Sequence, residues 1–284
     1  MSHVLPPEAA NDRRPSVGTN ASIEQPFAPM AAQHRPPRPN LLVIDACDLG
    51  VAELGAYGGA HADTPATDRL ALSGVRFTEA HTPVGHALGG HDLMQALGDH
   101  GYSADTFGAA ERVDLEIDVE SAVEFIGLHR AVPWAAYVRL HARPAPQEPL
   151  PSVLSYVNAV AGVDASIGRM VTSLRRSEQY RSTLVLVVGA SEGERLVFDR
   201  VHQPDAVRAR ADWMRVPTLL SWPGQIPPRQ RHDDVVLTAD WMPTLLSFAQ
   251  VRPGETGGAG AVDLSGHLLS GGGVPARDEQ IRAA

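Results

Sequence analysis

One apolar segment with polar residues at its end constrains the fold of this chain more than any other feature. Residues 39–50 read Pro-Asn-Leu-Leu-Val-Ile-Asp-Ala-Cys-Asp-Leu-Gly. A short apolar run bounded by a turn signal is typical of a strand that is buried on both faces. In open α/β sheets, ligands bind at the carboxyl ends of such strands. The pattern therefore places Asp45, Cys47 and Asp48 at a candidate functional edge.

The rest of the chain alternates between strand-like and helix-like segments. The strongest strand pattern is 183–188, which is continuous and rich in β-branched residues, and it leads to a second acid, Glu192. Further strands are expected at 75–77, 102–107, 133–141 and 217–222, and helices at 64–74, 93–100, 119–129, 152–174 and 239–249. This alternation predicts layered α/β packing with a mainly parallel sheet.

Length and charge narrow the classes of protein to consider. The 284 residues are 43% hydrophobic, enough for one sizeable core. The net charge of -9 argues against nucleic acid as a partner, because such binding depends on clustered Lys and Arg. No apolar run approaches the roughly 20 residues of a membrane span, so no membrane partner is expected. The partner itself cannot be read from the sequence.

Composition divides the chain into three parts. Residues 1–38 are rich in proline with scattered charges, and we expect a disordered arm without the apolar core of a signal peptide. Residues 39–270 form the expected α/β domain, and residues 271–284 a flexible tail. The expectation that follows is a cytoplasmic protein.

The order of these segments resembles the sulfatase family of the alkaline-phosphatase-like superfamily. The similar pieces are 39–50, 57–59, 64–70, 74–80, 156–174, 215–217, 222–224 and 240–246. The resemblance implies an alkaline-phosphatase-like α/β fold, with a mainly parallel central sheet and helices on both faces, in truncated form. It also implies the activity of sulfuric ester hydrolases.

The residues on which that activity depends are largely missing. The resemblance implies a Cys or Ser converted to formylglycine within a Cys/Ser-x-Pro-x-Arg signature, with metal, Arg, Lys and His meeting the charge of the sulfuryl oxygens. Here the residues after Pro83 read Val-Gly-His-Ala-Leu-Gly, without the nucleophile, the Pro or the Arg. The family's Lys and His near Phe107 are replaced as well, and Pro144 replaces a second His in the loop that retains His141. We therefore expect no catalytic residue.

The family's metal ligands are also altered. Two adjacent Asp ligands of the family fall on Cys47 and Asp48, and the metal-binding end of a later strand falls on Ser191 and Glu192. Calcium prefers oxygen ligands, whereas a thiolate suits zinc or copper. Asp45 could partly substitute for the lost oxygen, so the candidate ligands are Asp45, Cys47, Asp48 and Glu192. The alternative is that Cys47 is a small core residue and Asp45 a cap. No cofactor is expected; if one binds, it is a divalent cation, calcium in the family.

Other polar clusters have ordinary explanations. The group His81, His86, His91 and Asp92 could hold zinc if its loop folded back, but its spacing matches no compact zinc motif and a solvated loop is favoured. We expect surface positions for His202, His232, Asp233 and Asp234.

Two functions remain open. The first is a sulfatase-like protein that has lost its catalytic centre and keeps a binding, regulatory or vestigial role. The second is a metal-dependent hydrolase of sulfate or phosphate esters with a site rebuilt from Asp45, Cys47, Asp48 and Glu192. The first is preferred, because catalytic groups act as a unit.

Overall fold

The computed structural model describes residues 37–83, 88–108, 115–142, 153–190, 213–252 and 260–273. The predicted Pro-rich arm, apart from residues 37 and 38, lies outside these ranges, as do Glu192 and His202. Among the described helices, none is long and apolar enough to cross a membrane.

Strands and helices alternate along the described chain. The strands are β1 (Asn40–Cys47), β2 (Val75–Pro83), β3 (Ser103–Phe107), β4 (Trp134–His141), β5 (Thr183–Ala190), β6 (Trp213–Arg215), β7 (Thr218–Ser221) and β8 (Gln230–Leu237). The α-helices are α1 (Pro65–Leu72), α2 (Gly90–Gly98), α3 (Leu115–Leu128), α4 (Val153–Arg176), α6 (Trp241–Phe248) and α7 (Ser265–Ser270). Short 3-10 turns are η1 (Val51–Glu53), η2 (Gly55–Tyr57), η3 (Tyr180–Ser182) and η4 (Thr238–Asp240).

The described strands form one mixed sheet in the order β3-β4-β1-β5-β7-β2-β6, and β8 pairs with β2. Neighbours β3, β4, β1 and β5 are parallel, as are β2 and β8, whereas β6 and β7 run antiparallel to β2. The prediction of a mainly parallel sheet is therefore confirmed. The central strand β1 pairs with β4 on one side from Leu41 to Cys47 and with β5 on the other along its whole length.

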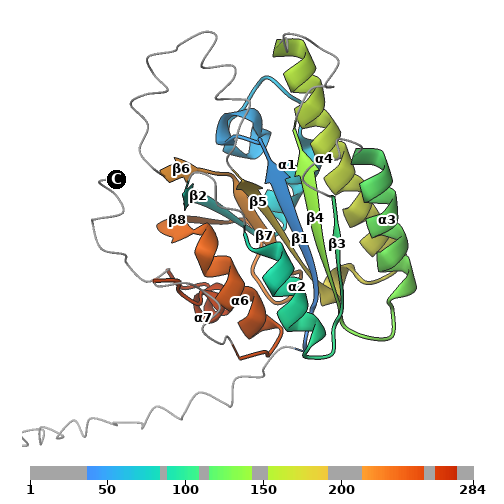
Figure 1. Cartoon of the computed structure of the whole chain (residues 1–284). Helices are drawn as coiled ribbons and strands as arrows, with labels where there is room; N and C mark the ends of the chain where they lie inside the picture. The colour runs from blue at the N-terminus through green and yellow to red at the C-terminus, as the bar shows by residue number, and fades with distance from the viewer. Residues whose placement is uncertain are drawn as a thin grey trace, which may run out of the picture. The chain divides into compact units, whose positions relative to one another are not determined.

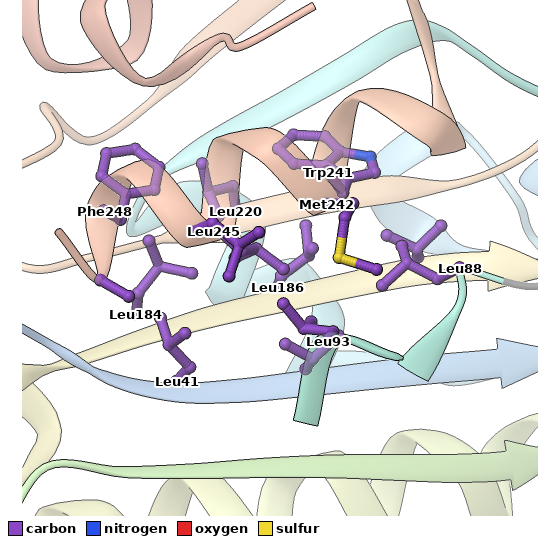
Figure 2. Packing of buried hydrophobic residues seen from close by; sticks show 14 of the residues in the cluster. Leu41, Leu88, Leu93, Leu184, Leu186, Leu220, Trp241, Met242, Leu245 and Phe248 are labelled. Atoms are coloured by element: carbon purple, nitrogen blue, oxygen red, sulfur yellow. The ribbon is translucent and has the colours of Figure 1, made fainter. Parts of the chain in front are cut away.

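Helices cover both faces of this sheet, and each face has its own apolar core (Figure 1). Helices α2, α6 and α7 pack on one face, and α1, α3 and α4 on the other. Figure 2 shows the first core, in which Leu41 of β1 and Leu184 and Leu186 of β5 face Trp241 and Leu245 of α6. Alternate residues of β1 point to opposite faces, so a strand covered on both sides must be apolar almost throughout.

Helix α4 illustrates how the sequence pattern sets the packing on the second face. Its buried residues recur every three or four positions and form one stripe: Val160, Val163, Ile167, Met170 and Leu174, each no more than 1% exposed. This spacing is that of an amphipathic helix with one buried face. The helix predicted for 152–174 is confirmed with small shifts of its ends.

A buried carboxylate joins α4 to α1. Asp164, only 3% exposed, accepts hydrogen bonds from the backbone N–H groups of Ala66 (2.9 Å) and Thr67 (2.8 Å) and from the Thr67 hydroxyl (2.8 Å). Thr64, at the N-cap position of α1, makes no capping bond with its side chain. A residue almost a hundred positions away therefore satisfies the free N–H groups at the start of α1.

Two strands and one helix were not predicted from the sequence. β6 is only three residues long, β8 begins Gln-Arg-His-Asp-Asp, and α7 lies in the Gly-rich region. The surface position expected for His232 in β8 is wrong. Its ring stacks on Phe77 with centroids 5.5 Å apart, the residue is 6% exposed, and burial lowers the pKa of the imidazole. Alternation along an edge strand explains this, since Arg231 and Asp233 on either side remain exposed.

The Asp164 cap gives a stability prediction. Replacing Asp164 by Ala leaves buried N–H groups of α1 without an acceptor, so we expect the free energy of unfolding to fall by about 2–3 kcal/mol in urea denaturation. Asp63→Ala, at an exposed position just before α1, is the matched control and is expected to change it by less than about 0.5 kcal/mol. Equal effects of the two substitutions would contradict this role for Asp164.

Candidate functional site

The ends of β1 and β4 bring the predicted polar residues to one edge of the sheet. In the register of these parallel strands Asp45 lies opposite Arg139 and Cys47 opposite His141. Asp45 and Cys47 are two positions apart on β1 and share the face covered by α2 and α6, and Asp48 follows the strand directly. Three of the four predicted ligands therefore lie together, and the fourth, Glu192, lies outside the described residues.

The carboxylate of Asp45 is buried and already engaged. It is 1% exposed and accepts a short hydrogen bond from the Tyr137 hydroxyl. The Nε of Arg139 lies 3.4 Å from the same oxygen, and the Sγ of Cys47 lies 3.7 Å from the other. A buried charge is stable only when it is paired and hydrogen-bonded. Asp45 thus has the contacts of a structural group within the sheet.

A glycine allows α2 to approach this network. A Cβ atom placed on Gly90, the first residue of α2, would lie 2.4 Å from the ring of Tyr137. Any other residue would push the helix away from β4. The start of α2 is therefore held against the aromatic ring that binds Asp45.

The thiol of Cys47 is held in its neutral form. Burial raises its pKa far above the usual range, and the negative charge of Asp45 raises it further, against a smaller opposing effect of Arg139. The thiolate, not the thiol, is the nucleophile and the metal ligand. At neutral pH this cysteine is therefore protonated.

Asp48 and His141 form the second buried contact at this edge. Asp48 has a left-handed backbone (φ 65°), a conformation that Asp adopts more readily than most residues. Its Oδ2 lies 3.6 Å from Nδ1 of His141, and the two residues are 2% and 9% exposed. Neither ring nitrogen of His141 has a hydrogen-bond partner within the described ranges. The hydroxyl of Tyr156 on α4 donates to the Asp48 carbonyl (3.0 Å) and fixes the turn.

These donors do not fit a calcium-type ion. Calcium takes six to eight oxygen ligands, several from carboxylates. Asp45 is already paired with Tyr137 and Arg139, and the sulfur of Cys47 is a poor ligand for calcium. In the part of the chain that the structure describes, no three His, Cys, Asp or Glu side chains are grouped to hold a metal ion.

The predicted histidine cluster is spread over two elements. His81 lies on β2 and its Nε2 is 3.2 Å from Glu79, while His91 and Asp92 are exposed on the first turn of α2. His86 lies outside the described residues.

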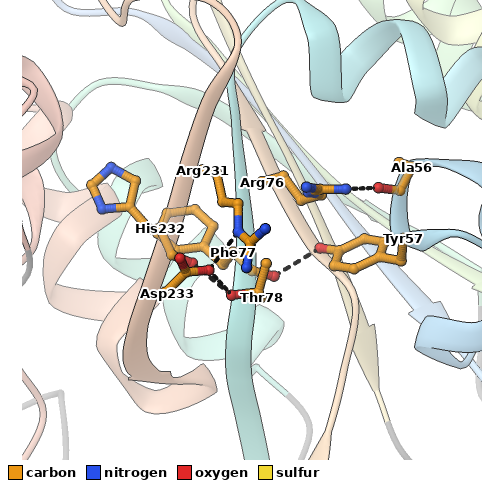
Figure 3. A network of polar contacts seen from close by, with 8 residues as sticks. All are labelled: Ala56, Tyr57, Arg76, Phe77, Thr78, Arg231, His232 and Asp233. Atoms are coloured by element: carbon orange, nitrogen blue, oxygen red, sulfur yellow. Dashed lines mark hydrogen bonds and ion pairs between the residues drawn. The ribbon is translucent and has the colours of Figure 1, made fainter.

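A second polar cluster surrounds a hollow of about 490 Å³ on β2 and β8 (Figure 3). Arg76 donates to a backbone carbonyl of η2 and lies over the ring of Tyr57, 5.6 Å from its centroid. Asp233 accepts from the Thr78 hydroxyl (2.5 Å) and from Nε of Arg231 (2.6 Å). These contacts tie η2 to β2 and β8 and give the cluster a structural role.

Sequence reasoning missed the residues that hold Asp45. Tyr137 and Arg139 occupy alternate positions of a strand whose apolar residues gave the signal, and Gly90 looks like a loop glycine. The one available signal was that Tyr137 and Arg139 lie two positions apart near the end of a buried strand. Residues at this spacing share a face of the sheet and can contact the same neighbour.

Comparison with known proteins gives the family. A family model described as "Sulfatase" matches residues 97–251, more than half of the chain. Arylsulfatase A of Bos taurus is 50% identical over 46 residues, which are 16% of this chain and 9% of the relative. Arylsulfatase A of Homo sapiens is 41% identical over 68 residues, 24% of this chain and 13% of the relative. The chain thus aligns with only a small part of either curated relative.

Solved structures share the fold over most of the chain. A structure from Bacteroides thetaiotaomicron, from work on glycosaminoglycan metabolism, superposes with a TM-score of 0.70 at 13% identity and covers 85% of this chain and 79% of its own. A sulfatase structure from Bacteroides fragilis has a TM-score of 0.64 at 19% identity and covers 86% and 81%. At such identities the likeness concerns the fold alone, and it confirms the alkaline-phosphatase-like α/β architecture. On the family match, this chain belongs to the sulfatase family.

Proposed function

We propose that this protein does not hydrolyse sulfate esters by the mechanism of its family and acts by binding instead. One observation carries the proposal: the carboxylate of Asp45 is already hydrogen-bonded to Tyr137 and ion-paired with Arg139. Beside it Cys47 is a neutral thiol. With Asp45 engaged and a thiol at position 47, the end of β1 is a poor match for a hard cation, which needs several oxygen ligands.

The absence of a nucleophile in the sequence supports the same conclusion. No Cys or Ser lies between Pro83 and His91, and the sole cysteine of the 284 residues is Cys47 on β1. All 24 basic residues are Arg, so the sequence contains no Lys to meet the charge of a sulfuryl group. Removing several members of a catalytic group removes most of the rate enhancement, because they act as a unit.

A second candidate function rests on the contact between Asp48 and His141. The two groups lie 3.6 Å apart, an ion-pair distance when the imidazole is protonated, at the edge where α/β proteins bind ligands. In this candidate function, Asp48 together with Asp45, Cys47 and Glu192 would form a rebuilt metal site for sulfate or phosphate esters. Metal content and ester hydrolysis distinguish the two proposals.

Metal content and turnover of the full chain test the proposed loss of activity. We expect purified protein supplied with calcium, magnesium or zinc to retain no stoichiometric ion by mass spectrometry of the elements. We also expect no hydrolysis of 4-nitrophenyl sulfate or 4-nitrophenyl phosphate above the level of Asp48→Asn. A stoichiometric ion, lost together with hydrolysis in Asp48→Asn but kept in Asp63→Asn, would establish the rebuilt site instead.

Titration of Cys47 tests the neutral thiol. Thiolate absorbance near 240 nm, with Cys47→Ser as the blank, is expected to be absent in the folded protein up to about pH 10 and to appear near pH 8.5 in urea, the usual thiol range. Because the unfolded chain releases this proton first, the free energy of unfolding falls as pH rises above about 8.5. Cys47→Ser removes that part of the fall. A folded-state thiolate near pH 8.5 would contradict the assignment.

A further inference from the structure

The helical face formed by α1, α3 and α4 contains a groove bordered by arginines. Its volume is about 740 Å³. Arg69 of α1 lies along it, Arg130 follows α3, and Arg169 and Arg176 belong to α4. All four side chains are exposed.

Small residues on the face of α4 that lines the groove leave space between α1 and α3. Ala161, Ala165 and Gly168 are spaced by four and three positions, so they share one face of the helix. A Cβ atom on Gly168 would lie 3.2 Å from the Cβ of Ala66, so α1 packs tightly on this stripe. On the other side Gly127 of α3 borders the same groove. The groove thus follows the line along which α1 and α3 pack on α4.

Three of the four guanidinium groups lack an acidic partner. Neither Arg69, Arg130 nor Arg176 forms an ion pair with a carboxylate in the described ranges. Arg169 lies 3.5 Å from Glu120, but both side chains are largely exposed (45% and 65%), and such pairs contribute little. The Nε of Arg130 donates to the backbone carbonyl of Gly127 (3.2 Å), but this bond leaves its charge without a carboxylate partner. The positive charges of the groove are therefore available to an anionic ligand.

The acidic residues of the groove do not balance these charges. Asp164 is buried and directs its carboxylate to the start of α1, which leaves Asp63 as the other acid of the lining. The groove is thus positive in a chain whose net charge is -9. By contrast, Arg231 in the hollow on β2 and β8 is paired with the carboxylate of Asp233.

We propose that this groove binds a compact polyanion that carries two or more sulfate or phosphate groups. Guanidinium groups present paired N–H donors that match the oxygens of such groups in bidentate fashion. Thr172 and Ser173 of α4 add hydroxyl groups to the lining. The volume lies in the range of small-molecule sites.

The groove and the end of β1 lie toward opposite ends of the strands. Its α4 residues come from the part of the helix that leads through η3 into the start of β5, and Arg130 lies just before the start of β4. Asp45 and Asp48 lie at the carboxyl end of β1. Binding in the groove therefore goes beyond the proposed function of the β1 end and holds whichever role that end performs.

Calorimetric titration of the full chain tests this site. The probes are sucrose octasulfate, inositol hexakisphosphate and inorganic sulfate, so that sulfate and phosphate sources are distinguished. We expect saturable binding of at least one of the two polyanions, with inorganic sulfate at least about tenfold weaker because it engages fewer guanidinium groups. The double variant Arg69→Gln/Arg176→Gln is expected to bind the polyanion at least about tenfold more weakly.

The control is a double variant with the same change of net charge. Arg215→Gln/Arg231→Gln removes two arginines that border the hollow on β2 and β8, and its affinity is expected to stay within about twofold. Arg130→Gln is a second groove variant, and circular dichroism verifies folding of all of them. The proposal is overturned if neither polyanion binds, if the groove variants bind as well as the parent, or if both double variants lose affinity equally, which would indicate general charge attraction.

Discussion

The carboxylate of Asp45, buried at the end of the central strand, has to be neutralised by its neighbours for the sheet to form. It is 1% exposed between β4 and the start of α2. The cost of taking an unpaired charge out of water is several kcal/mol, so the Tyr137 hydroxyl and the Arg139 guanidinium are required wherever Asp45 is ionised. That requirement also sets the chemistry of the edge, because the same negative charge adds to the burial that keeps Cys47 protonated.

Much of the fold could be predicted because the buried strands of this sheet have apolar sequences. β1, β4 and β5 are largely apolar segments, and α4 carries its buried apolar residues at helical spacing, so both kinds of element follow from the sequence pattern. β8 could not be predicted in this way. It lies beside β2 at the end of the sheet, and its Arg231, Asp233 and Asp234 interrupt the pattern although His232 is buried against Phe77.

The candidate site was predictable in position but not in its contacts. The strand-end rule brought Asp45, Cys47 and Asp48 to one edge from sequence alone. The partners of Asp45 depend on the register between β1 and β4, two strands separated by more than eighty residues, and local sequence carries no information on that register. The same is true of Asp164, whose bonds to the start of α1 could not be read from α4.

Charged groups are buried at one end of the strands and exposed toward the other. At the carboxyl end of β1 the polar groups are buried. Asp45 is held by Tyr137 and Arg139, and Asp48 lies 3.6 Å from His141 without a hydrogen bond to its ring. A ligand binding there would first have to break bonds inside the protein, and each buried group left without its partner costs about 1–3 kcal/mol. In the groove between α1 and α3, the arginines are exposed. The contacts that Arg169 makes with Glu120 and Arg130 with the Gly127 carbonyl are exposed as well, so an incoming anion competes with weak interactions. The proposed binding role therefore fits the exposed arginines of the helical face better than the buried polar groups at the end of β1.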